Sequence, residues 1–324
     1  MFGGLGDHLF ALPALEEFHR RAGYPCFDVF CCHMPELLRD MPYFAAVHTV
    51  PCRDLVPEWA GGTNRYKMIP CLTVGEGSGI DCGENVPPNY AFKLLEVDDM
   101  PYSQRRIMIH LRGQDRENAY SIAKELGWAG QPIVCVQMGG AMKSKHYSHL
   151  WRLLCRLSEH GYFAVWHEVG QLTAFDYRRT NNLVTRRLPS IRMLASLQSI
   201  SFCHFGFDSG PSYLASAVEC PSVILSGFTD INGILGHLEG MRWVHQIRRN
   251  WPYKCARQHG LSCRSFAGAD SAGGVEFCPV RGRWFGEATP DKLGCDCMDI
   301  VSVDEIIGTI EYAGNAKLNE RYSV

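Results

Sequence analysis

The sequence predicts an α/β protein with two domains, each built around a parallel sheet. The chain has 324 residues, which is enough for two domains that each bury a core of their own. Short apolar segments alternate with helical segments, a pattern typical of parallel sheets. Residues 201–225 give the clearest example, because they read as a strand, a tight turn, a helix and a second strand.

Composition and charge argue against several functional classes. There are 32 Lys and Arg residues against 34 Asp and Glu residues, so the basic excess typical of nucleic-acid-binding proteins is missing. The sequence contains no run of eighteen apolar residues and no secretory signal. We therefore expect a cytoplasmic protein without a membrane span and without a nucleic-acid partner. In such a protein, the 15 cysteines predict buried small apolar side chains and, in one region, a metal site.

The first element is a glycine-rich loop followed by a helix, in residues 1–23. Gly3, Gly4 and Gly6 allow the backbone to approach a ligand closely, and Asp7 lies at or near the start of the helix. An ordinary turn in which Asp7 caps the helix fits the same residues. Spacing alone therefore leaves both interpretations open.

The rest of the first half contains weaker signals. Residues 51–104 are rich in Pro, Gly and Asn, so we expect mainly loops there. The expected elements are strands 27–32, 46–50 and 106–111 and helices 90–95 and 114–126. The turn at residues 127–131 is the expected boundary between the two domains.

The second half opens with a strand, residues 132–137, and a glycine-containing loop with two lysines. Lys143 and Lys145 precede an amphipathic helix at residues 147–160. A lysine near a glycine turn suits an anionic diphosphate, whereas solvated surface lysines are the commoner alternative. The loop is not a Walker A loop, because no G-x-x-x-x-G-K-[ST] pattern occurs.

The next strand, residues 162–166, leads to His167 and Glu168. The segment HEVGQ lacks the second histidine of H-E-x-x-H, which excludes a zinc protease of that class. Glu168 fits either a ligand contact or a helix cap or solvated loop position. Residues 188–199, LPSIRMLASLQS, are expected to form a packing helix, because they resemble the helix that leads into the Asp-Ser-Gly strand in the enzyme family identified below.

The chain is organised around residues 205–227. A strand ends in Asp208, Ser209 and Gly210, and Pro211 then occupies the first helical position, where its missing N–H costs nothing. Free N–H groups at that helix start would suit a phosphate at the carboxyl edge of the sheet. An ordinary turn is the alternative, since Asp, Ser and Gly are also the usual turn residues.

The last part of the chain contains a cysteine-rich region, residues 250–298. Aliphatic residues are few there, so a core cannot easily order the region, and a metal held by thiolates would supply what the core lacks. The tight C-x2-C pairs of zinc ribbons are absent, and free structural thiols are the alternative. The region contains Cys255, Cys263, Cys278, Cys295 and Cys297. A closing helix is expected at residues 303–313.

Two of these stretches resemble segments of one enzyme family. DSGPSYLASAVECPSVILSGFTD is similar to D-[ST]-G-x-x-H-L-[AT]-A-A-x-x-x-P-x-[VI]-x-L-[FY]-G-x-T, with Tyr213 in place of the His. GGLGDHLFALPAL is similar to G-x-x-G-D-x-L-x-x-x-P-A-L. Both patterns belong to the heptosyltransferase-like enzymes of glycosyltransferase family 9, which have the GT-B fold. The resemblance assigns the role of catalytic base to Asp7. The apolar strand that precedes this loop in the family has no counterpart in the sequence.

The resemblance extends to the donor side and to the cysteines. The family's K-x-W segment is matched by K-x-Y at Lys145, which favours Lys145 over Lys143, and a carboxylate near Glu168 often contacts the donor nucleoside in the family. WPYKCARQHGLSC, FCPVRG and CDCMDIVSVDEIIGTIE resemble a subgroup that includes autotransporter heptosyltransferases, in which cysteines bind one iron. The implied ligands are Cys255, Cys263, Cys278 and Cys297, with Cys297 preferred to Cys295.

The resemblance thus implies a GT-B protein with two Rossmann-like domains facing a cleft. Residues 1–128 would form the acceptor-side domain. Residues 129–302 would form the nucleotide-sugar-binding domain, including the cysteine-rich segment 250–298. Residues 303–324 would form the closing helix and tail. The expected cofactor is one structural iron or zinc, and no catalytic magnesium is expected because no D-x-D motif is evident.

The implied activity is transfer of a sugar from a nucleotide-sugar donor, with ADP-heptose as the first candidate. Asp7 would take the proton of the acceptor hydroxyl, and Lys145 with the N–H groups after Asp208 would stabilise the departing diphosphate. The implied donor-binding residues are Lys145, Glu168, Asp208, Ser209, Gly210 and Tyr213, and the acceptor-side loop contains Gly3, Gly4 and Gly6. The acceptor, such as a glycan or a protein, is left open, as is a homo-oligomer.

Two other functions remain as alternatives. The missing first strand and Tyr213 favour a nucleotide-sugar-binding or assembly protein that keeps the GT-B scaffold without catalysis. A nucleotide-sugar epimerase of the same architecture would need paired acid and base groups, which the sequence does not identify. Turnover of a nucleotide sugar separates the enzyme from the binding protein, and the identity of the product separates the transferase from the epimerase.

Overall fold

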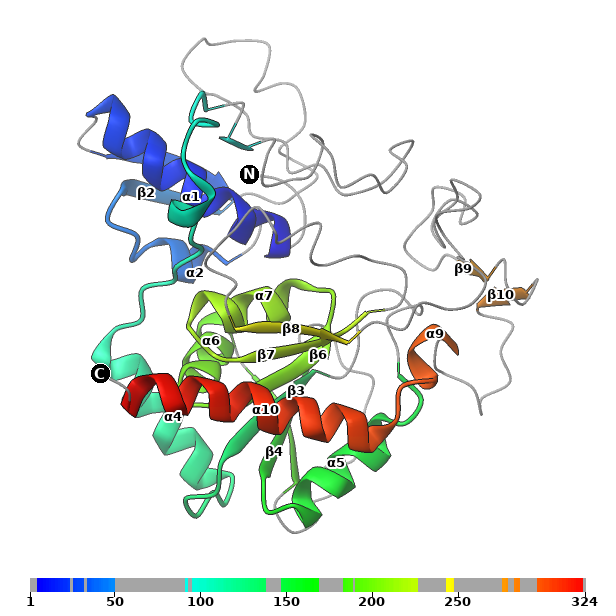
Figure 1. Ribbon diagram of the computed structural model, residues 1–324. Coiled ribbons are helices and arrows are strands. Elements are labelled where there is room, and N and C mark those ends of the chain that lie inside the picture. The colour runs from blue at the N-terminus through cyan, green and yellow to red at the C-terminus, as the bar shows by residue number, and fades with distance from the viewer. Residues whose placement is uncertain are drawn as a thin grey trace.

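The computed structural model in Figure 1 describes twelve ranges of the chain. They are residues 5–23, 26–31, 34–49, 91–92, 95–137, 147–168, 183–188, 190–226, 243–247, 276–278, 283–285 and 296–322. Within these ranges, no helix combines the length and the apolar character that crossing a membrane requires.

A six-stranded sheet forms the centre of the molecule (Figure 1). The strands are β3 (Ile133–Gln137), β4 (Phe163–Glu168), β5 (Leu183–Arg187), β6 (Cys203–Phe207), β7 (Ser222–Leu225) and β8 (Val244–Ile247). Their order is β5-β4-β3-β6-β7-β8, and all neighbours are parallel. This order, which reverses between β3 and β6, is that of the Rossmann fold. The expected parallel Rossmann-like sheet of the second domain is therefore confirmed.

Apolar sequence runs explain why the central strands form. β3, β6 and β7 are buried along their whole length, as is usual for parallel strands covered on both faces. One face of the sheet packs on α5 (Leu150–Glu159) and α10 (Val303–Tyr322). The other face packs on α6 (Ile191–Ser199) and α7 (Gly210–Ala217), and α4 (Gly113–Glu125) packs against α6. The result is a three-layer αβα arrangement.

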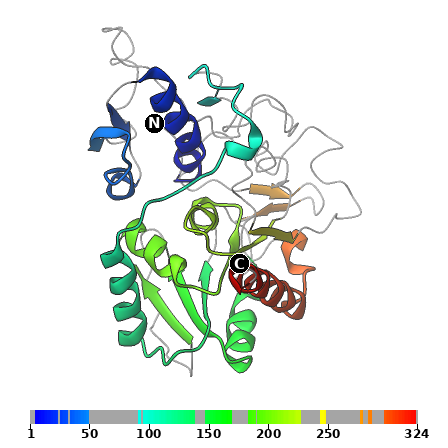
Figure 2. The same ribbon diagram turned by 60° about the vertical axis from the view of Figure 1, so that its left-hand side comes forward.

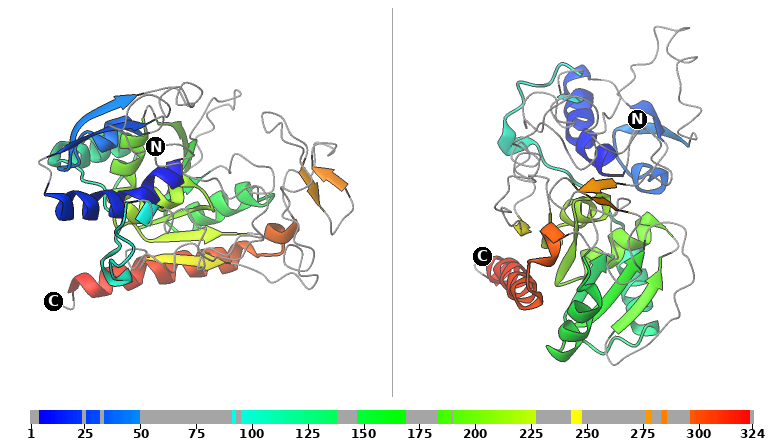
Figure 3. Two further views of the ribbon diagram at one scale, coloured as in Figure 1. Left: turned by 90° about the horizontal axis from the view of Figure 1, so that it is seen from above. Right: turned by 90° about the vertical axis from the view of Figure 1, so that its right-hand side faces the viewer.

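The N-terminal elements form a separate group beside this sheet, as Figures 2 and 3 show. They are α1 (Leu5–Ala22), β1 (Phe27–Cys31), α2 (Pro35–Leu38) and β2 (Phe44–Thr49). β1 and β2 pair in parallel. The division of the chain at residue 128 stays a prediction, and α4, which precedes that residue, packs against α6 of the second sheet.

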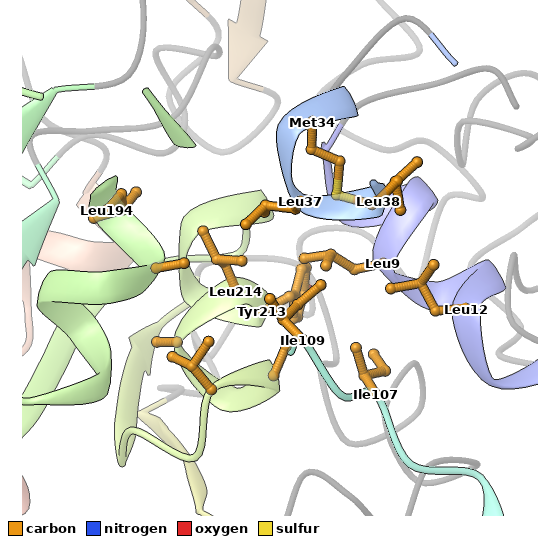
Figure 4. Packing of buried hydrophobic residues seen from close by; sticks show 14 of the residues in the cluster. Leu9, Leu12, Met34, Leu37, Leu38, Ile107, Ile109, Leu194, Tyr213 and Leu214 are labelled. Carbon is orange, nitrogen blue, oxygen red and sulfur yellow. The ribbon is translucent and has the colours of Figure 1, made fainter. Parts of the chain in front are cut away.

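An apolar core joins the N-terminal group to the sheet, because α1 packs directly on α7. Leu9 and Leu12 of α1 belong to the same buried cluster as Tyr213 and Leu214 of α7 (Figure 4). Ile109, from the segment that leads into α4, lies in this cluster as well. The two parts of the chain are therefore held together by a continuous core at α1 and α7.

Charged residues hold the same two parts together at a second place. Arg192 of α6 donates to both carboxylate oxygens of Asp115, at 2.9 and 2.6 Å, and forms an ion pair with Asp40, which follows α2. Its third donor binds the backbone carbonyl of Glu36 in α2, at 2.7 Å. Arg192 holds the pKa of Asp115 below its usual value, chiefly through this hydrogen-bonded pair.

Four short elements complete the described structure. They are the 3-10 helix η2 (Tyr102–Gln104), the antiparallel pair β9 (Glu276–Cys278) and β10 (Arg283–Phe285), and α9 (Asp296–Asp299). The hydroxyl of Tyr147 donates to the carbonyl of Val301 at 2.7 Å, and the backbone N–H of Ser148 donates to Asp299 at 2.8 Å. The segment before α5 is thereby fixed to the segment before α10.

Most expected elements are confirmed, and one is wrong. The strands expected at 27–32, 46–50, 132–137 and 162–166 and the helices expected at 114–126, 188–199 and 303–313 all occur, with shifted ends. The segment 106–111 forms no strand. Its alternating Ile107 and Ile109 are buried instead against the helical layer, and the N–H of Ile109 donates to the carbonyl of Ala217 at 3.0 Å. Residues 50–90 lie outside the described part.

Candidate functional site

The candidate site lies at the carboxyl edge of the sheet, between β3 and β6. Ligands of open α/β sheets bind at this edge, where the strand order reverses. The turn that follows β6 contains Asp208, Ser209 and Gly210 and is called the 208–210 turn. The hydroxyl of Ser209 donates to the side-chain carbonyl of Gln137 at the end of β3, at 2.7 Å. This bond connects the two strands at the point of reversal.

Ser209 is the N-cap residue of α7, but its side chain does not cap the helix. Its hydroxyl donates to Gln137 and also to the carbonyl of Phe207, at 3.2 Å. Pro211 in the first turn has no N–H to be capped, which suits that position. Because the Ser209 side chain does not cap α7, the positive end of the helix dipole favours an anion at the 208–210 turn.

Tyr213, the residue that replaces the family's His, lies directly behind this turn. Its side chain is buried, and its hydroxyl donates to the carboxylate of Asp208. The ring packs against Phe10 of α1, with ring centroids 4.7 Å apart. The phenol therefore holds Asp208 in place while its ring forms part of the α1 and α7 contact.

Two glycines bring the start of α1 against the same turn. A Cβ atom on Gly6 would lie 3.0 Å from the ring of Tyr213, and one on Gly210 would lie 2.6 Å from the Cβ of Leu5. Neither position has room for a larger side chain. Asp7 follows Gly6 in α1, so its backbone lies beside the 208–210 turn; its side chain and residues Gly3 and Gly4 lie outside the description.

Four buried polar side chains lie near the 208–210 turn and were not predicted as site residues. They are Gln137, Gln198, His204 and Ser212. Two of them could have been found from the sequence, because Gln137 ends the apolar strand IVCVQ and His204 lies within CHFGF. Polar groups in such strands are buried at a cost unless they are hydrogen-bonded. The hydrogen bonds of Gln137 and His204 therefore offset the cost of burying these two side chains.

His167 is a fifth buried polar residue, at the end of β4 next to Gln137 in the sheet. Its ring stacks on that of His204 with centroids 5.5 Å apart. Neither ring nitrogen has a hydrogen-bond partner in the described part of the chain. Burial lowers the pKa of His167 to about 3, so the ring is neutral. Glu168, the last residue of β4, follows it, and its side chain is not described.

Several expected site residues lie outside the described part. They are Lys143, Lys145, Cys255, Cys263 and Cys295. Cys278 lies in β9 and Cys297 in α9, without a description of their side chains. Among the residues that are described, no three His, Cys, Asp or Glu side chains come together as a metal site would require. The metal site therefore stays a prediction.

Four of the six cysteines whose side chains are described are buried, as the sequence predicts, whereas Cys26 is exposed and Cys155 is half-buried. Cys31, Cys135, Cys203 and Cys220 are buried. Burial raises the pKa of Cys135 to about 12, which keeps its thiol protonated. These residues therefore act as small apolar side chains in the core.

Comparison with known proteins gives matches among solved structures alone. No protein-family model matches the sequence, and no curated protein matches it. A glycosyl transferase family 9 structure from Veillonella parvula has 12% identity and a TM-score of 0.64, covering 98% of this chain and 96% of that one. Escherichia coli ADP-heptose lipopolysaccharide heptosyltransferase II has 14% identity and a TM-score of 0.61, covering 98% of both chains.

A third similar structure is the iron-containing dodecameric glycosyltransferase TibC from enterotoxigenic E. coli. It has 16% identity and a TM-score of 0.56 and covers 98% of this chain and 75% of that one. TibC also has a structure in complex with ADP-D-β-D-heptose, which matches at 15% identity and a TM-score of 0.58. At these identities the comparisons establish the fold. It is an α/β glycosyltransferase fold with parallel sheets, which fits the GT-B expectation.

Proposed function

We propose that this chain is a glycosyltransferase that moves a sugar from a nucleotide-sugar donor to an acceptor hydroxyl. The observation that carries the proposal is the meeting of two segments at the carboxyl edge of the sheet. The start of α1, which contains Asp7, contacts the 208–210 turn through Gly6 and Gly210. A candidate base and a candidate anion site are thus neighbours in the fold.

The donor would lie along the carboxyl edge, with its diphosphate at the 208–210 turn. The uncapped start of α7 favours a negative charge there. In the sequence Lys145 comes after β3, and Glu168 is the last residue of β4, whose carboxyl end lies at the same edge of the sheet. Glu168 would contact the nucleoside and Lys145 the diphosphate. ADP-heptose is the first candidate donor, since it is bound in one structure of TibC, which shares the fold.

In the proposed reaction the acceptor oxygen attacks the anomeric carbon of the sugar. The bond from that carbon to the diphosphate breaks, and the nucleoside diphosphate leaves with the electron pair. Asp7 accepts the proton of the acceptor hydroxyl, a step that typically contributes about 10² to 10⁴ in rate. Lys145 and the N–H groups at the start of α7 stabilise the charge on the departing diphosphate. We expect this stabilisation to work without magnesium.

Replacement of Asp7 by Asn tests the proposed base. Asp7→Asn keeps the shape of the side chain and most of its capping capacity while it removes the charge. Folding and donor binding should be preserved, and turnover should fall by about 10² to 10⁴. Lys145→Ala should weaken donor binding by about 1 to 3 kcal/mol, with Lys143→Ala as the matched control. Loss of folding in Asp7→Asn, with unchanged turnover per folded molecule, would leave Asp7 with a purely structural role in the first turn of α1.

The cysteine-rich region would hold one structural iron or zinc. Thiolates are suitable ligands for either metal in a tetrahedral site, and Cys278 and Cys297 lie in the described elements β9 and α9. Cys255 and Cys263 would complete the set. Elemental analysis should find about one metal per chain, with the metal lost in Cys297→Ser and retained in Cys295→Ser. A folded, metal-free protein would contradict the site.

A nucleotide-sugar-binding scaffold without catalysis is the second candidate function. It is favoured by Tyr213, which stands where the family has His and whose hydroxyl donates to Asp208. Turnover with ADP-heptose and a panel of acceptors separates the two functions. A cytoplasmic location and a homo-oligomer are further parts of the proposal, the latter because TibC, with the same fold, is a dodecamer.

A further inference from the structure

A polar network of three buried side chains surrounds the 208–210 turn. The network consists of Gln198 on α6, His204 on β6 and Ser212 on α7. The amide nitrogen of Gln198 lies 3.2 Å from Nδ1 of His204, and Nε2 of His204 lies 3.2 Å from the hydroxyl oxygen of Ser212. All three residues are buried, so no solvent competes with these bonds.

The hydrogen bonds of the network run in one direction. The amide nitrogen of Gln198 also donates to the carbonyl of Pro211, at 2.9 Å, which fixes the orientation of the amide. Nδ1 of His204 must therefore accept, and Nε2 carries the proton and donates to Ser212. The hydroxyl of Ser212 in turn donates to the carbonyl of Phe207, at 2.7 Å. A neutral His204 satisfies all of these bonds, and burial lowers its pKa well below the usual value.

The network holds both ends of the 208–210 turn. Phe207 is the last residue before the turn, and Pro211 is the first residue after it. Their carbonyl groups accept from Ser212 and Gln198 respectively. A second contact, from Ser209 to Gln137, holds the middle of the turn at 2.7 Å. The backbone of the proposed anion site is therefore fixed by buried side chains on either side.

Gly206 is the point where these contacts meet. A Cβ atom on Gly206 would lie 2.5 Å from the hydroxyl of Ser212, 2.7 Å from Nε2 of His204 and 2.8 Å from the side-chain oxygen of Gln137. Such distances are too short for a real side chain, so the three polar groups can converge because residue 206 has none. Glycine at this position is thus a requirement of the network.

We propose that His204 is a positioning residue that sets the backbone of the 208–210 turn for a diphosphate group. The inference rests on the proposed function, since it assigns the turn to the donor diphosphate. An apolar side chain would fill the same space without the cost of burying polar atoms. The benefit of His204 is its geometry, because one ring accepts from Gln198 and donates to Ser212 at a fixed spacing.

The test compares His204→Leu with His167→Leu. Both histidines are buried, lie on strands of the same sheet and stack on each other, but His204 alone belongs to the network. His204→Leu should weaken binding of ADP-heptose about ten-fold, which corresponds to the net free energy of about one hydrogen bond. His167→Leu removes the stacked ring but no hydrogen bond of the network, so it should weaken donor binding much less. His204→Gln, which retains one acceptor and one donor, should recover most of the affinity.

Two further measurements test the inference. The first uses a variant other than His204→Leu, and the second needs no donor. Ser212→Ala removes the last donor of the network with little change in volume and should weaken ADP-heptose binding in the same direction. Hydrogen exchange without ligand should be faster at the amides of residues 208–210, 212 and 213 in His204→Leu than in His167→Leu. If the unmutated protein binds no nucleotide sugar, the proposed function fails, and the exchange result still decides whether His204 positions the turn. Equal exchange, or equal affinity losses in the two Leu variants, would overturn the role of His204.

Discussion

Replacement of His167 tests how a buried, neutral histidine makes the stability of the protein depend on pH. Burial lowers its pKa to about 3 in the folded protein, against an ordinary value of 6.5. The folded state therefore binds fewer protons than the unfolded state between these two values. For such a group, stability is fully present above pH 6.5 and is lost as the pH falls toward 3. His167→Leu removes the titrating group and should therefore make stability less dependent on pH.

The size of the effect follows from the two pKa values. One proton taken up on unfolding changes the free energy of unfolding by about 1.4 kcal/mol per pH unit well below the unfolded pKa. For a pKa of 6.5 in the unfolded chain, the cumulative loss between pH 7 and pH 5 is about 2 kcal/mol. His204, which is buried, and His245, which is half-buried, also have lowered pKa values and add to the loss in the unmutated protein. The difference between the protein and its variant isolates His167.

Urea denaturation at pH 7, 6 and 5, at one ionic strength, measures this difference. The loss of unfolding free energy should be smaller in His167→Leu by about 2 kcal/mol over the range. The pKa values of Glu17 and Asp115 are lowered by their arginine partners. Their contributions to stability are therefore lost only below the ordinary carboxylate pKa of about 4, and they affect the range from pH 7 to pH 5 little. The exposed His110, changed to Gln, serves as the control for a substitution at the surface. Parallel profiles for the protein and His167→Leu would refute the assignment of a buried neutral ring.

Two other predictions concern the junction between the N-terminal group and the sheet. Arg192→Met leaves Asp115 and Asp40 without their shared partner and should lower the free energy of unfolding by about 3 kcal/mol at pH 7. Because Arg192 lowers the pKa of Asp115, the stability that this pair contributes is present above the pKa of Asp115 in the unfolded chain and is lost as the pH falls through its pKa in the folded protein. Urea denaturation at pH 3 that shows the same loss of stability in Arg192→Met as at pH 7 would contradict this. Gly210→Ala places a Cβ 2.6 Å from that of Leu5 and should cost about 1 to 3 kcal/mol in thermal or urea unfolding. Gly113→Ala, at the open start of α4, has no atom within 4 Å of its Cβ and should be neutral or stabilising; equal losses in the two variants would show that the α1 and α7 contact can yield.

Local signals in the sequence were sufficient to predict the strand β6, the 208–210 turn and the helix α7. An apolar run, a turn-forming Asp-Ser-Gly and a Pro at the first helical position all act within a few residues, so they can be read without the fold. The segment 106–111 shows the limit of the same reasoning. This segment is predicted as a strand, but Ile107 and Ile109 are buried in a segment that pairs with no described strand, and the N–H of Ile109 donates to Ala217 of α7.

The candidate site was predictable in part for the same reason. The resemblance identified the 208–210 turn and the glycines of α1, but their meeting depends on contacts between distant parts of the chain. The network around His204 was not found, since Gln198, His204 and Ser212 come from three elements that only the fold brings together. A buried polar residue in an apolar strand is the one signal that points to it in the sequence.

The contact between α1 and α7 also has a consequence for how the chain is made. Phe10 and Tyr213, whose rings pack together, are separated by 203 positions (213 − 10) in the sequence. At about 5 to 20 residues per second, a ribosome needs about 10 to 40 seconds to add that length. During this interval Leu9 and Leu12 have no α7 to cover them. Because contacts between such distant segments form slowly, the apolar face of α1 is a surface that newly made protein would present to chaperones before the domains meet.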